Sequence, residues 1–243
     1  DWVIHFKESD LELLPTQILT TGYLTNEWVK MSKSLGNVID PVVFTREQYN
    51  KELLTLYLLS SINIGQDWDF SEKQAVLMYN AKLANNFWNL LNRAVVLTLK
   101  LDLENGLDLD VTSELSEVLA NYKNDFKSSF DNYNLKNALD YSFAFLDSLN
   151  TYTTQKEPWK MMKEEGRLEE TKVVLYTICE WLRVVGLCLY SFFPEKMALM
   201  FKALWLENYA EILENGWLSE LLNKKEIFNI KEKSDILFEK FDV

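Results

Sequence analysis

The chain is 243 residues long and 48% apolar, which is enough to bury a sizeable core and excludes a disordered protein. It has only 7 Gly and 4 Pro beside 8 Trp, 11 Tyr and 14 Phe, a balance that favours long helices over a turn-rich β-sandwich. Its formal charge of −12 excludes nucleic-acid binding through a generally basic surface, so any such contact must come from a local patch.

Residues 1–44 have the pattern of an α/β domain edge. DWVIHF is a short strand-like run, and QILTTGYLTNEWVKMSKS mixes β-branched and aromatic residues with a glycine. Because the segment is too short to bury both faces of a sheet, it predicts a remnant of an α/β domain. DWVIHF lacks the basic start of a signal peptide, and no uninterrupted apolar run reaches membrane-spanning length. We therefore expect a cytoplasmic protein with no membrane partner.

A lysine-rich turn follows this segment: Lys30, Met31, Ser32, Lys33 and Ser34. Two ammonium groups on one turn can reach different oxygens of a polyphosphate, and serine hydroxyls and loop amides add neutral donors. In adenylyl transfer, such cations stabilise the charge that develops on the leaving pyrophosphate. Gly36 and Asn37 tolerate the positive φ of a sharp loop. On composition alone, a solvated basic turn is the alternative interpretation.

From Thr45 onward the pattern is helical. Thr45 with Gln48 has the capping-box spacing and predicts a helix start. The stretch INIGQDWDF predicts a loop. Ser71 with Gln74 repeats the capping-box spacing and predicts a long helix that ends at about Lys100.

One face of this long helix carries Asn85, Asn89 and Arg93 at positions i, i+4 and i+8. Leucine, phenylalanine and alanine occupy the opposite side, as on a normal core face. The spacing alone fits an ordinary solvated stripe. Amide and guanidinium groups, however, offer the paired donors and acceptors that can read the edges of unpaired bases.

The remaining chain predicts four more helices after an acidic connector at 104–113. They cover about 113–129, 134–156, 167–192 and 195–208. Pro158 ends the second of them, because proline cannot continue a helix without losing a hydrogen bond and clashing. The tail from Ile212 alternates apolar and charged residues and should pack back on the body. The prediction is a mainly α fold, a helix bundle preceded by a short α/β remnant.

Three residue types limit the chemistry. Cys179 and Cys188 have apolar neighbours and predict buried free thiols, with no metal spacing or disulfide framework. His5 is the single histidine, which argues against a metal site and against His-based catalysis. Trp159 follows Pro158 at a predicted helix start. Its ring either stacks on a splayed-out base or fills the gap between two helices.

Several motifs together resemble a known family. KMSKS resembles the second signature of class I aminoacyl-tRNA synthetases, and MSKSLGNVIDP resembles its form in the methionine, valine, leucine and isoleucine branch. GQDWDFSEKQAVLMYNAKLANNFWNLLNRA, LNTYTTQKEPWKMMKEEGR and LRVVGLCLYSFFPEKM resemble the anticodon-binding half of methionyl-tRNA synthetases. The N-x-Y-x(5)-P-W arrangement, which includes Asn150 and Trp159, separates this family from the valine enzymes. The resemblance covers nearly the whole chain and is weakest at residues 1–10 and 205–243.

The resemblance implies the C-terminal portion of such an enzyme, with the edge of a Rossmann-like catalytic domain at 1–60 and a helical anticodon-binding domain at 61–243. The complete enzyme would use ATP, with Mg²⁺, to activate methionine and would then esterify it to tRNA(Met). The loop at 30–34 would close over ATP, and Lys30 and Lys33 would serve the adenylation step. Asn89 and Arg93 would read the anticodon, and Trp159 would stack on one of its bases.

The sequence also departs from the family pattern. The family's first ATP-binding signature, a His-Ile-Gly-His-like motif, is absent, so we expect that this chain alone makes no methionyl-adenylate. Thr21-Gly22 stands where members of the resembled family usually carry His-Gly, and Thr55 stands where they usually carry Arg. Either the chain is a piece of a larger synthetase or it is a shortened relative. The alternative functions are a non-catalytic tRNA-binding protein and a helical protein-interaction module.

Overall fold

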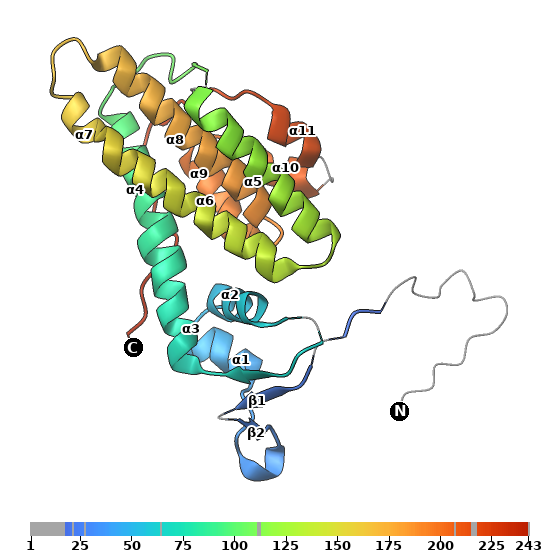
Figure 1. Ribbon diagram of the computed structural model, residues 1–243. Coiled ribbons are helices and arrows are strands. Elements are labelled where there is room, and N and C mark those ends of the chain that lie inside the picture. The colour runs from blue at the N-terminus through green and yellow to red at the C-terminus, as the bar shows by residue number, and fades with distance from the viewer. Residues whose placement is uncertain are drawn as a thin grey trace.

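The computed structural model describes residues 18–242 except positions 21, 27, 64, 111–112, 207 and 215–217. It shows a helical bundle with a small sheet below it, joined by one long helix (Figure 1). The mainly α fold class is therefore confirmed. The strand predicted in DWVIHF, His5 and Thr21 lie outside the described residues.

The sheet has three short strands in the order β2-β1-β3. Strand β1 (Leu24–Asn26) pairs antiparallel with β2 (Val29–Lys30) and parallel with β3 (Trp68–Phe70). The loop predicted for INIGQDWDF is wrong at its end, because Trp68 pairs with Leu24 across 44 positions of sequence.

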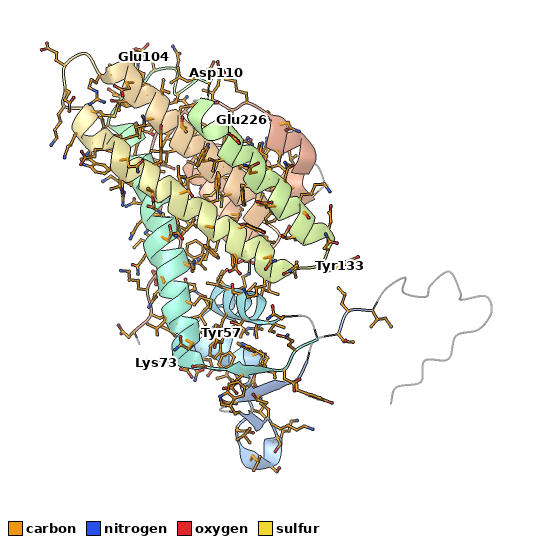
Figure 2. The ribbon with its side chains drawn as sticks, viewed as in Figure 1. Tyr57, Lys73, Glu104, Asp110, Tyr133 and Glu226 are labelled. Carbon is orange, nitrogen blue, oxygen red and sulfur yellow. The ribbon has the colours of Figure 1, made fainter. Side chains whose placement is uncertain are left out.

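Tyr57 joins the sheet to the helices (Figure 2). Its ring packs edge-on against Trp68 and Phe70, and its hydroxyl accepts a hydrogen bond from the Ser71 amide at 3.2 Å. Because Ser71 caps the next helix, this aromatic group fixes where that helix leaves the sheet.

The helices next to the sheet begin at residues other than the predicted Thr45. Helix α1 (Pro41–Val43) is capped by Asp40, and a π-helical turn, η3 (Phe44–Gln48), contains Thr45. Helix α2 (Lys51–Ser61) is capped by Asn50, whose side chain accepts from the Leu53 amide at 2.9 Å. The Thr45–Gln48 capping box is wrong because the Thr45 hydroxyl donates to the Pro41 carbonyl at 2.7 Å inside a helix that has already begun.

The long helix was predicted correctly in its extent but not in its winding. It runs through α3 (Glu72–Tyr79), η4 (Asn80–Trp88) and α4 (Asn89–Leu99). The Ser71 cap is confirmed, since its hydroxyl accepts from the Gln74 amide at 3.4 Å. The middle segment η4 is π-helical, which no local sequence signal predicts. π-helical insertions are frequent at functional sites.

The bundle packs around one buried helix. Its elements are α5 (Ser113–Asp131), α6 (Leu135–Lys156), α7 (Pro158–Met161), α8 (Leu168–Leu189), α9 (Pro194–Ala203), α10 (Tyr209–Glu214) and α11 (Leu218–Asn223). Helix α8 is buried along nearly its whole length between α6, α4 and α9. The break at Pro158 is confirmed: α6 ends at Lys156, and Glu157 has a φ of 49°.

The last predicted helix is shorter than expected. It ends at Ala203 rather than near residue 208, and Trp205 and Asn208 have φ angles of 62° and 61° in the connector that follows. Such angles turn the chain out of a right-handed helix. Helices α10 and α11, which were not predicted, come after this turn.

The tail packs back on the body, as predicted. Phe228, Leu237 and Phe238 are buried, and Phe228 forms an isolated antiparallel bridge with Leu107 of the connector. The Asn80 side chain donates to the Phe241 carbonyl at 2.7 Å and accepts from the Phe241 amide at 3.0 Å. The tail therefore runs from the bundle to the long helix near the sheet (Figure 1).

The two cysteines are buried free thiols, as predicted. Burial raises the pKa of the Cys179 thiol to about 12 and that of the Cys188 thiol to about 11. Both side chains therefore remain protonated at neutral pH and are inert as nucleophiles. None of the described helices is both long and apolar enough to cross a bilayer.

Candidate functional site

The predicted phosphate loop is a compact turn that follows strand β2. Residues Lys33–Leu35 form a 3₁₀ turn, and Gly36 has a φ of 67° as its left-handed cap. The Ser32 hydroxyl accepts from the Leu35 amide at 3.3 Å and lies 3.0 Å from the Ser34 hydroxyl. Both serines thus stabilise the turn that displays Lys33.

Asn37 closes the base of this loop. Its side-chain oxygen accepts from the Ser32 amide at 2.9 Å, and its side-chain nitrogen donates to the Lys30 carbonyl at 3.3 Å. Its own carbonyl accepts from the Asn26 side chain at 3.0 Å. The loop is therefore tied to strand β1 by side-chain amides.

The two lysines of the loop are exposed, whereas Met31 packs against the core. The Lys30 ammonium lies 5.6 Å from the centroid of the exposed Tyr23 ring. Exposed ammonium groups beside two hydroxyls form a donor set that fits a polyphosphate. Among the described residues, no group of three or more His, Cys, Asp or Glu side chains could hold a metal ion.

The predicted base-reading residues lie on the opposite part of the molecule, along α4 and at the start of α7. The Arg93 guanidinium carbon lies 5.8 Å from the centroid of the Trp159 ring. Asn89, one turn before Arg93, is exposed, and so is Asn85. The structure thus brings together two residues that are 66 positions apart and leaves an exposed amide beside them.

Trp159 is half-buried, so neither interpretation of its ring is complete by itself. It packs against the core, as a residue between helices does, while part of its side chain reaches the surface beside Arg93. Pro158 at the first position of α7 and the left-handed Glu157 before it fix the direction in which the ring leaves the backbone.

A hydrogen-bonded group beside these residues was not predicted. The Asn86 side chain donates to Asp147 at 2.6 Å and accepts from the Asn150 side chain. Asp147 and Asn150 lie on α6, so this group joins the long helix to α6. The signal that could have found it is the i, i+3 spacing of Asp147 and Asn150, which places two polar side chains on one side of α6.

Comparison with known proteins finds relatives that match most of the chain. A family model described as "tRNA synthetases class I (M)" matches residues 2–95. The methionine–tRNA ligase of Mycoplasmopsis pulmonis is 32% identical over 242 residues, 98% of this chain and 45% of the relative. The methionine–tRNA ligase of Thermotoga maritima is 32% identical over 212 residues, 83% of this chain and 33% of the relative. The chain is a homologue of the methionyl-tRNA synthetases.

Solved methionyl-tRNA synthetases share the fold. The apo enzyme of Mycobacterium tuberculosis superposes with a TM-score of 0.78 at 22% identity, over 95% of this chain and 45% of that enzyme. The complex of that enzyme with methionyl-adenylate superposes with a TM-score of 0.76 at 24% identity, over 90% of this chain and 43% of that enzyme. The chain spans less than half the length of the curated relatives it matches.

Proposed function

We propose that the chain forms part of a methionine–tRNA ligase in which the KMSKS loop assists activation of methionine and the helices bind the anticodon of tRNA(Met). In this proposal, residues 1–60 belong to the catalytic domain and 61–243 to the anticodon-binding domain. The observation that carries the proposal is the contact between Arg93 and Trp159. It places a guanidinium and an indole, drawn from distant parts of the chain, on one surface beside Asn89.

The chemistry of this surface suits an unpaired base. An exposed part of an indole can stack on any base, and a guanidinium and an amide offer directional donors and acceptors to base edges. A few such groups can bind RNA even though the protein has a net charge of −12, because stacking and base-edge contacts do not require a generally basic surface. We therefore assign base stacking to Trp159 and base reading to Asn89 and Arg93.

The loop supports the adenylation half of the proposal. The methionine carboxylate would attack the α-phosphate of ATP, which is bound with Mg²⁺, and pyrophosphate would leave. Lys30 and Lys33 would stabilise the negative charge that grows on this leaving group, while the Ser32 and Ser34 hydroxyls and Met31 shape the loop around them. The cytoplasmic location stays a prediction.

Anticodon recognition predicts that the chain distinguishes two tRNAs that differ only there. Initiator tRNA(Met) should bind more tightly than the same tRNA with a changed anticodon, because a wrong base loses edge contacts to Asn89 and Arg93. Filter binding or fluorescence anisotropy at one fixed salt concentration measures both dissociation constants. Equal weak binding of the two tRNAs would contradict the proposal and favour a helical protein-interaction module.

The 243-residue chain should show no ATP–pyrophosphate exchange with methionine. The KMSKS loop holds only one side of the nucleotide, and the sequence contains no His-Ile-Gly-His-like motif to hold the other. A complete methionyl-tRNA synthetase assayed in parallel provides the positive control. Detectable exchange by this chain would show that its residues suffice for adenylation.

One sequence feature favours a second candidate, a non-catalytic tRNA-binding protein derived from the synthetase. Thr55, half-buried in α2, stands where the family resemblance leads us to expect an arginine. This candidate shares the anticodon surface but not the adenylation role. It would be favoured if adding a synthetase catalytic half to the chain restored no exchange while discrimination between the two tRNAs persisted.

A further inference from the structure

The side chain of Asn86 makes hydrogen bonds that join the long helix to α6. Its nitrogen donates to the Asp147 carboxylate at 2.6 Å, and its oxygen accepts from the Asn150 nitrogen. Asn150 also donates to the Leu146 carbonyl of its own helix at 3.3 Å. These contacts have a direction: Asn150 donates to Asn86, and Asn86 donates to Asp147. This series of hydrogen bonds therefore fixes the orientation of the Asn86 and Asn150 side-chain amides.

Asn86 belongs to the π-helical segment η4, which ends at Trp88, directly before Asn89. A π-helical insertion changes which residues of a helix share a face, because each turn holds more residues than an α-helical turn. The bonds from Asn86 to α6 therefore hold the helix at the place where its winding returns to α-helical and the base-reading residues begin.

Two contacts thus follow one another along the long helix, the first with α6 and the second with α7. The first joins Asn86 to Asp147 and Asn150, and the second joins Arg93 to Trp159. Asn86 and Arg93 are seven residues apart, or about 10 Å along an α-helix. Asn89 lies between the two contacts. The contact of Asn86 with α6 therefore sets the distance between Asn89 and Trp159, the two residues that would face a ligand.

We propose that Asn86 and Asn150 are positioning residues for anticodon binding, which act by holding the long helix at a fixed distance from the α6–α7 segment that carries Trp159. The inference rests on the proposed function and names residues for which that function gives no role. Both amides are engaged with protein groups, so they act through Asn89, Arg93 and Trp159 rather than by touching the base.

The test is a thermodynamic cycle on tRNA binding. Asn150→Ala should weaken binding of initiator tRNA(Met) by about tenfold, or about 1.4 kcal/mol, which is within the range of coupling between neighbouring residues. In a Trp159→Ala background the same change should cost less than about twofold, because the ring that Asn150 positions is gone. Asn86→Ala should behave in the same way. Asn124→Ala, which alters an exposed asparagine on α5, is the matched control and should change neither value.

The outcomes separate the inference from the proposed function. Equal losses in both backgrounds would mean that Asn150 only stabilises the fold, and no loss in the unaltered background would mean that it has no role; either result overturns the inference alone. Circular dichroism melts of each variant verify that the chain is folded at the assay temperature. Failure of the unaltered chain to distinguish the two anticodons would overturn the proposed function and this inference together.

Discussion

Trp159→Ala should weaken tRNA binding by about 1–3 kcal/mol, a loss of roughly five- to 150-fold in the association constant. The expected cause is the loss of stacking between the indole and an anticodon base. Arg93 would also lose the ring beside which its guanidinium lies. Titration of labelled initiator tRNA(Met) with the variant, at one fixed salt concentration, measures the effect.

Two variants show whether stacking is the cause. Trp159→Phe keeps an aromatic face and should retain most of the affinity, whereas Trp159→Leu keeps apolar volume and should not. Because Trp159 is half-buried and packs against the core, the alanine variant should also melt at a lower temperature. A lowered melting temperature with unchanged affinity would show that the indole serves only the core.

Glu180→Ala should lower the free energy of unfolding by about 3–5 kcal/mol, because it leaves a buried guanidinium without its counter-ion. The Arg183 side chain is 0% exposed and donates to both carboxylate oxygens of Glu180, at 2.7 and 2.6 Å. It also donates to the Leu221 carbonyl at 2.6 Å and to the Tyr209 hydroxyl at 3.3 Å. Urea unfolding followed by circular dichroism measures the change.

A surface pair and a double variant provide the comparison. Glu170→Ala removes one partner of the exposed Arg167 and should leave unfolding nearly unchanged, because solvent screens that pair. Replacing Glu180 and Arg183 together with leucine and methionine should cost less than Glu180→Ala alone, since no charge then stays buried. A small effect of Glu180→Ala would mean that water or another group reaches the guanidinium.

Local signals predicted the helices well. The Ser71 cap and the break at Pro158 depend on atoms within a few residues, so they can be recognised in the sequence and are confirmed. Thr45 shows the limit of such signals, because Asp40 had already capped a helix that contains it. A capping-box spacing is therefore a reliable helix start only where no stronger cap comes before it.

Features that depend on distant partners were missed. Strand β3 exists because Trp68–Phe70 lies beside β1, and nothing within INIGQDWDF specifies that pairing. The hydrogen bonds of Asn86 likewise depend on α6, which comes some 60 residues later. These contacts are non-local, so a single sequence without its fold carries only weak traces of them.

The candidate site also combines features that the sequence predicted with a contact that only the structure shows. The spacing of Asn89 and Arg93 fits an ordinary solvated stripe as well as a base-reading one, and only the resemblance selected between the two. The contact of Arg93 with Trp159 is new information from the structure, since it joins two predicted residues through space. The roles of these residues in tRNA binding stay predictions.

The return of the tail to the long helix has a consequence for the order of folding. Asn80 bonds to both backbone polar groups of Phe241, across 161 positions of sequence. Phe241 also packs against Tyr79 and Tyr49, next to the sheet that supports the KMSKS loop. Contacts of such sequence separation form late, because the chain entropy of a large loop must be lost first. On the ribosome, these contacts therefore cannot form until synthesis has passed residue 241.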